Sequence, residues 1–117
     1  MWFASPKIKV YLGLGATDMR KSIDGLSVLV SEHLKQNPLN GHFFVFCNRR
    51  RTILKILYWD RNGFCLWHKR LELDKFRWPE SRSEVREISI RELRWLIEGL
   101  DIQQAQAHGN LDYQTVY

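Results

Sequence analysis

The stretch that decides the fold runs from Gly41 to Pro79 and reads GHFFVFCNRRRTILKILYWDRNGFCLWHKRLELDKFRWP. Bulky apolar and β-branched residues form three runs, and two short polar segments separate them. Such short loops favour antiparallel pairing of consecutive strands, and Asn62-Gly63 supplies residues that tolerate positive φ. We therefore predict an antiparallel β-meander with strands at His42–Cys47, Thr52–Trp59 and Phe64–Leu71 and turns at Asn48–Arg51 and Asp60–Gly63.

The same stretch carries most of the positive charge of the chain. Residues 48–78 hold nine Lys or Arg and three Asp or Glu, a net charge of +6. Residues 1–47 have a net charge of +2 and residues 79–117 a net charge of −3, which together give the +5 of the whole chain. A basic patch in a chain with a pI near 9.5 favours an anionic partner such as nucleic acid, although a merely soluble basic protein has the same composition.

The second strand of the meander is apolar on both of its faces. One face carries Ile53, Leu57 and Trp59 together with Lys55, and the other carries Leu54, Ile56 and Tyr58. A sheet with one wet face alternates more cleanly between polar and apolar residues. Either other elements cover both faces, or one face is an exposed aromatic platform; core packing is the commoner explanation.

The segment before the meander predicts one strand and one helix. Lys7–Leu12 alternates polar and apolar residues as a half-buried strand does, and Gly13–Ala16 is expected to end that strand. Apolar residues then recur at helical spacing over Met19–Gln36, and Thr17 or Asp18 is expected to cap this helix.

Two cations, Arg20 and Lys21, fall in the first turn of this predicted helix. Cations oppose the helix dipole at that end, so their presence is locally unfavourable. Together with the free N–H groups of the turn they would form a phosphate site. The alternative, that both side chains are simply solvated, stays open.

The composition changes after Trp78-Pro79. Residues Glu80–Glu87 are charged and are expected to form a loop or linker. Ser89 and Glu92 fit a capping box, which predicts a helix over Ser89–Leu100 with Gly99 as its C-cap.

The chain as a whole predicts one small α+β domain over residues 1–100. We expect an antiparallel sheet that consists of the meander and the Lys7–Leu12 strand, with the two helices packed on it. Residues 101–117 form a polar tail that is either flexible or ordered by a partner. Cys47 and Cys65 are too few for a disulfide scaffold, so we expect reduced thiols and a cytoplasmic protein. No stretch approaches the roughly 20 apolar residues that span a bilayer, so no membrane partner is expected.

The assembled motifs resemble a known family. In the meander they are Phe46-x-Asn48-Arg49-Arg50, Lys55-x-Leu57-Tyr58-Trp59-Asp60, Gly63-Phe64-Cys65-Leu66-Trp67, Lys69-Arg70-Leu71-Glu72 and Phe76-x-Trp78-Pro79, and before it Asp18-Met19-Arg20-Lys21-Ser22 and Asp24-Gly25-Leu26. This string looks like the small accessory protein, the second reading frame (TnpB or Orf2-like), of bacterial insertion sequences of the IS sixty-six type. The likeness covers roughly residues 7–100. It implies a role in DNA transposition beside a separate transposase, and it supplies no mechanism.

Catalysis and cofactors are not expected from the residues themselves. A metal-dependent nuclease needs carboxylates gathered around its ions, and no motif unites the candidates Asp18, Asp24, Asp60, Glu72 and Asp74. The Cys and His residues lack the paired spacing of a zinc site. Cys65 and His68 are three residues apart on a strand, so they face opposite sides of the sheet.

Binding is the function that the residues favour. Guanidinium groups at a turn tip suit phosphates, and basic residues between aromatics suit nucleic acid. The predicted DNA-binding residues are Arg20, Lys21, Arg49, Arg50, Arg51, Lys55, Arg61, Lys69, Arg70 and Arg77. The predicted function is a non-catalytic accessory protein that binds DNA, such as the element ends, with the transposase of the same element as a second partner. The alternative is an interaction module that docks on that transposase without touching DNA. The oligomeric state is left open.

Overall fold

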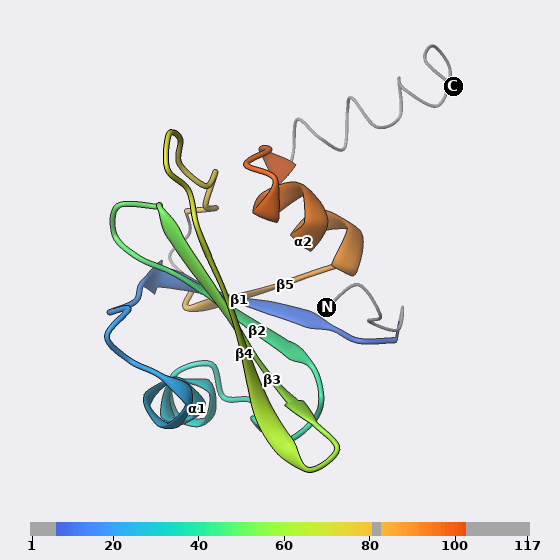
Figure 1. The fold of residues 1–117 in the computed structure, drawn as a ribbon. Coiled ribbons are helices and arrows are strands. Elements are labelled where there is room, and N and C mark those ends of the chain that lie inside the picture. The colour runs from blue at the N-terminus through green and yellow to red at the C-terminus, as the bar shows by residue number, and fades with distance from the viewer. Residues whose placement is uncertain (1–6, 81–82, 103–117) are drawn as a thin grey trace.

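The computed structural model describes residues 7–80 and 83–102 and consists of one five-stranded sheet with a helix on each face (Figure 1). The strands are ordered β4-β3-β2-β1-β5 across the sheet. The elements in chain order are β1 (Val10–Ala16), α1 (Ile23–Glu32), β2 (Phe43–Cys47), β3 (Ile53–Asp60), β4 (Gly63–Arg70), β5 (Val85–Ile88) and α2 (Ile90–Ile97). The α+β class is therefore confirmed.

The predicted meander is confirmed, since β2 pairs antiparallel with β3 and β3 pairs antiparallel with β4. Both turns contain an arginine in the left-handed backbone region, Arg51 with φ 63° and Arg61 with φ 50°. The expectation that Asn62-Gly63 would supply the positive φ is wrong, because Arg61 adopts it instead. A left-handed backbone conformation is uncommon for residues with a long side chain. The antiparallel pairing of the strands that flank each turn therefore imposes this conformation on Arg51 and Arg61.

Strand β1 differs from the prediction in its length and in its direction. It runs parallel to β2, because the segment between the two strands, which contains α1, carries the chain back to the end of the sheet at which β1 begins. It also continues through Gly13–Ala16, which was predicted to end it, with a register shift between Leu12 and Ala16. A Cβ atom at Gly13 would lie 3.1 Å from the ring of Phe46, so the glycine here allows close strand packing rather than a chain break.

Helix α1 is shorter than the predicted Met19–Gln36 helix. It begins at Ile23, with Ser22 as the N-cap, and the Ser22 side chain makes no capping hydrogen bond. The predicted cap at Thr17 or Asp18 is therefore wrong. Asp18 instead bonds the backbone N–H of Arg20, at 2.9 Å, in a loop that precedes the helix. Arg20 and Lys21 consequently lie outside the first helical turn.

The two helices cover opposite faces of the sheet. Leu26 and Val30 of α1, together with Leu34 two residues beyond its end, pack with Phe44, Phe46 and Leu57. Leu93, Leu96 and Ile97 of α2 pack with residues of the other face, including Leu12, Val45, Leu54 and Ile56. The interpretation that both faces of β3, the second strand of the meander, are covered is confirmed, and the exposed aromatic platform is excluded for that strand.

The C-terminal part of the fold adds a strand where a loop was predicted. Residues Val85–Ile88 pair antiparallel with Val10–Gly13, so the assignment of Glu80–Glu87 to a loop or linker is wrong in its second half. Four residues with two charges do not form a recognisable alternating pattern by themselves. The capping box of Ser89 and Glu92 is confirmed, and Gly99 follows the helix with φ 85°. Ile102 is buried in the core, and the tail from residue 103 onward lies outside the described residues.

Candidate nucleic-acid interface

The topology gathers three loops at one end of the sheet. Because β1 is parallel to β2, the loop after β1 emerges beside the β2–β3 turn, and the N–H of Thr17 donates to the carbonyl of Cys47 at 2.9 Å. The segment after β4 also returns there, since the N–H of Leu71 donates to Thr52 at 2.8 Å and that of Phe76 to Arg51 at 2.7 Å. These contacts bring together segments that are up to about 60 residues apart in sequence.

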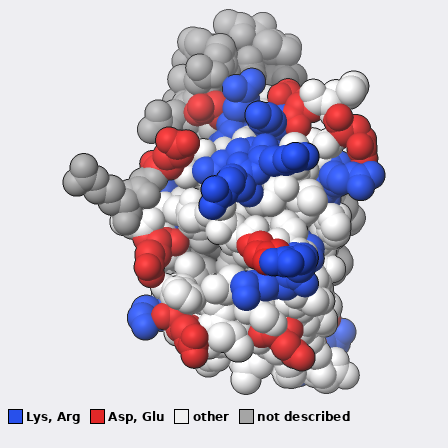
Figure 2. Space-filling view, turned by 90° about the vertical axis from the view of Figure 1, so that its left-hand side faces the viewer, with Lys and Arg blue, Asp and Glu red and all other residues white. Residues whose placement is uncertain are grey.

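We call this region the basic end. It contains eight of the predicted DNA-binding residues: Arg20, Lys21, Arg49, Arg50, Arg51, Lys69, Arg70 and Arg77. Figure 2, which looks at the left-hand side of Figure 1, shows Lys and Arg side chains gathered in the upper part of this face, with Asp and Glu around them. Arg61 lies at the opposite end, in the turn between β3 and β4, with its Nε 3.6 Å from Asp60.

The β2–β3 turn presents two of its three arginines to solvent. Arg49 and Arg50 are exposed, whereas Arg51 is half-buried and its Nη1 is buried without a hydrogen-bond partner. Two of the three arginines therefore stand in solvent. The Asn48 side chain holds the turn, because its Oδ1 accepts from the N–H groups of Thr52 and Ile53 at 2.9 and 3.0 Å. The exposed arginines thus project from an ordered turn.

Cys47 lies under this turn and is not a reactive thiol. Burial raises the pKa of Cys47 to about 11, and the nearby Arg51 lowers it only in part. The thiol therefore stays protonated at neutral pH.

Two of the predicted DNA-binding lysines are engaged inside the fold. Lys55 is only 9% exposed, and its ammonium donates to the carbonyls of Met19 and Lys21 at 2.9 and 3.0 Å. Lys69 donates to the carbonyl of Ile97 at 3.0 Å, at the C-terminal end of α2, where the helix dipole favours a cation. Lys55 therefore fastens the loop before α1 and Lys69 fastens the end of α2, so each ammonium has an acceptor inside the fold.

Two of the arginines at the basic end are paired with carboxylates. Arg20 binds Asp18 with Nη2–Oδ2 at 2.7 Å, and this hydrogen bonding lowers the pKa of Asp18 to about 2. Arg70 binds Glu72 with Nη2–Oε1 at 2.9 Å. Within residues 7–80 and 83–102, the exposed cations of the basic end that have no carboxylate partner are Lys21, Arg49, Arg50 and Arg77.

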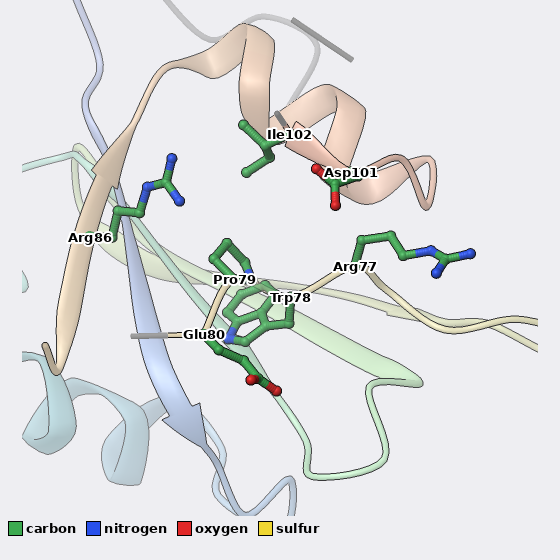
Figure 3. Close-up of a pocket in the computed structure, with 7 residues that line it drawn as sticks. All are labelled: Arg77, Trp78, Pro79, Glu80, Arg86, Asp101 and Ile102. Carbon is green, nitrogen blue, oxygen red and sulfur yellow. The ribbon is translucent and has the colours of Figure 1, made fainter. Parts of the chain in front are cut away.

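Arg77 also borders a cavity of about 370 Å³ between the segment after β4, β5 and the chain after α2 (Figure 3). Arg86 projects from β5 towards this cavity, whereas the Arg77 side chain extends away from Trp78. Trp78 is 6% exposed, and its Nε1 has no partner. Sequence reasoning missed Arg86, because its strand was interpreted as a loop.

The carboxylates of the described part of the chain do not gather into a metal-binding cluster, and its candidate stacking aromatics are at least half-buried. No group of three or more Cys, His, Asp or Glu residues there could hold a metal ion. Phe76 and Trp78 are buried, and Tyr58, Trp59 and Trp67 are half-buried.

No described helix has the length and apolar character to cross a membrane.

The fold and the basic end together define a small α+β protein with a cationic surface and no recognisable catalytic site in the described residues. The chain belongs to the family described as IS66 Orf2 like protein, which matches residues 8–107. Membership confirms the predicted resemblance and makes this a transposition-associated accessory protein.

Two curated proteins of Sinorhizobium fredii (strain NBRC 101917 / NGR234) are similar to the chain. The uncharacterized protein y4hO is 38% identical over 99 residues, which cover 85% of this chain and 86% of that protein. The uncharacterized protein y4jC is 33% identical over 94 residues, 80% of each chain. No solved structure matches significantly.

Proposed function

We propose that this accessory protein has no catalysis of its own and binds DNA of its element through the basic end. The observation that carries the proposal is the set of four exposed cations without a carboxylate partner, Lys21, Arg49, Arg50 and Arg77, on three loops that converge at one end of the sheet. Exposed, unpaired cations release counterions from DNA when they contact phosphates. Lys55 and Lys69 are left out of this surface, because backbone carbonyls occupy their ammonium groups.

The arrangement favours contact with the phosphate backbone over stacking with bases. The aromatics nearest the basic end, Phe76 and Trp78, are in the core and present no face on which a base could stack. The loops instead display guanidinium and ammonium groups to solvent. Such contacts position a protein on DNA and carry little sequence information.

The experiment is a binding titration of a duplex carrying the element's terminal repeat and of a scrambled duplex over a range of salt concentrations. Replacing both Arg49 and Arg50 by alanine should reduce the slope of log affinity against log salt by roughly two units, and should weaken both duplexes nearly alike. The matched control replaces Arg61 and Lys9, two exposed cations at the opposite end of the sheet. Equal slopes for the two double variants would remove the basic end from DNA binding.

A second candidate function is docking on the transposase of the same element. Leu73 is fully exposed, at 101%, in the charged loop that follows β4 beside the basic end. A leucine side chain offers a phosphate backbone no hydrogen bond or charge, whereas it can be buried against an apolar surface of a protein partner. Docking predicts weak DNA affinity with little salt dependence, and loss of transposase capture in the Leu73→Ser variant. Unchanged capture in that variant would contradict docking through this loop.

A further inference from the structure

The outer edge of the sheet at β4 has features of a pairing edge. β4 has eight residues and pairs with β3 in eight consecutive positions without a register shift. The strand contains no proline, and its charges are confined to its C-terminal end at Lys69 and Arg70. The opposite edge, β5, has only four residues, two of them charged. Natural sheets usually blunt an exposed edge with short strands, bulges, prolines or charges, and β4 has few of these protections.

The hydrogen-bonding direction of β4 follows from one contact. The N–H of Leu71 points to Thr52, so it faces the β3 side. Backbone groups alternate in direction along an antiparallel strand. Residues 63, 65, 67 and 69 therefore bond β3, whereas the N–H and C=O groups of Phe64, Leu66, His68 and Arg70 face outward. Among the described residues no strand lies beyond β4 to receive them.

We propose that β4 pairs with β4 of a second copy of this chain in an antiparallel, two-fold symmetric arrangement that joins the two sheets. This inference goes beyond the proposed function and does not depend on it. One register uses all four outward-facing residues: Phe64 of one copy lies opposite Arg70 of the other, and Leu66 lies opposite His68. Each pair exchanges two bonds, which gives about eight bonds between the copies. Trp67 of each copy then lies at the two-fold axis.

The charges of the edge select a second copy in this register. Antiparallel pairing places the cationic end of each strand opposite the apolar half of the other, so Lys69 meets Cys65 and no like charges face each other. It also brings the turn that holds Arg61 beside Glu72 and Asp74 of the other copy. A register shifted by two residues leaves either Phe64 or Arg70 without a partner, and one such shift sets His68 against His68. Parallel pairing in register would align the cationic ends.

The experiment measures the mass of the full chain by sedimentation equilibrium over a dilution series. The wild type should be a dimer at the higher concentrations. His68 is exposed and its N–H faces outward, so His68→Pro removes no bond to β3 while it blocks the partner strand. The matched control, His68→Thr, keeps the N–H. We expect a folded monomer for the proline variant and a dimer for the threonine variant. A monomeric wild type, or a proline variant that dimerises like the wild type, would overturn the proposal.

Hydrogen exchange of the wild type keeps the proposal testable should the proline variant fail to fold. The outward amides of Leu66 and His68 should exchange more slowly in concentrated than in dilute protein. The inward amide of Cys65 should be protected at both concentrations, because it bonds β3. Exchange of Leu66 and His68 that does not depend on concentration would rule out the paired edge.

Discussion

Lys55 provides a sharp test of how the basic end is built, because its ammonium holds the loop that carries Arg20 and Lys21. The change is Lys55→Met, which keeps a long unbranched apolar side chain under α1 and removes the charged donor. The carbonyls of Met19 and Lys21 lose their contacts at 2.9 and 3.0 Å. Each carbonyl left without a donor costs about 1–3 kcal/mol, and rehydration of the loop recovers part of this. Relief from burying an ammonium offsets a further part. We therefore expect a loss of about 2–4 kcal/mol in the free energy of unfolding.

The assay is urea unfolding followed by tryptophan fluorescence, with an unchanged m-value as evidence that the unfolding transition is the same. The matched control is Lys75→Met, the same substitution at an exposed position, for which the change should stay within about 0.5 kcal/mol. If Lys55→Met lowers the free energy of unfolding no more than the control does, the two hydrogen bonds of Lys55 do not stabilise this loop. The salt slope of DNA binding distinguishes the two roles of this residue: a fastening role leaves the slope unchanged in Lys55→Met, and a phosphate contact reduces it by about one unit.

Three further predictions concern other parts of the chain. Because the pKa of Asp18 is lowered to about 2 from an ordinary value of 3.8, its ion pair contributes stability above about pH 4 and loses it as the pH falls towards 2. NMR titration of the Asp18 carboxyl should give a midpoint near 2 that rises towards 3.8 in Arg20→Ala; a wild-type midpoint near 4 would contradict the pairing. Replacing Ser89 by alanine removes one half of the capping box of α2 and should cost about 1 kcal/mol in thermal unfolding, with Ser22→Ala as the control, because the Ser22 side chain makes no capping hydrogen bond at the start of α1; no difference between the two would show that the cap contributes nothing. The purified protein should not nick DNA with Mg²⁺ or Mn²⁺, and metal-dependent nicking that disappears in Asp60→Ala or Glu72→Ala would overturn the non-catalytic assignment.

Sequence patterns correctly predicted those helices and strands that depend mainly on residues close together in the chain. The meander follows from apolar runs separated by short polar turns, and β2, β3 and β4 lie where these runs predict. The start of α2 follows from Ser89 and Glu92, because a capping box involves residues only three positions apart. The apolar character of both faces of β3 correctly indicated that a layer covers each face.

The sequence by itself therefore determined the α+β class, the meander, the capped helix and the region that carries the positive charge. Only the tertiary structure decided that β1 runs parallel to β2, that Val85–Ile88 forms the fifth strand, and which cations remain open to a partner. Lys55 finds its acceptors 34 and 36 residues away and Lys69 finds its acceptor 28 residues away, whereas Arg61 is carried to the opposite end of the sheet. The physical reason is that periodicity and capping are set by residues close in sequence. The partner of a strand edge or of a buried ammonium is set by packing between segments that the chain brings together only when it folds.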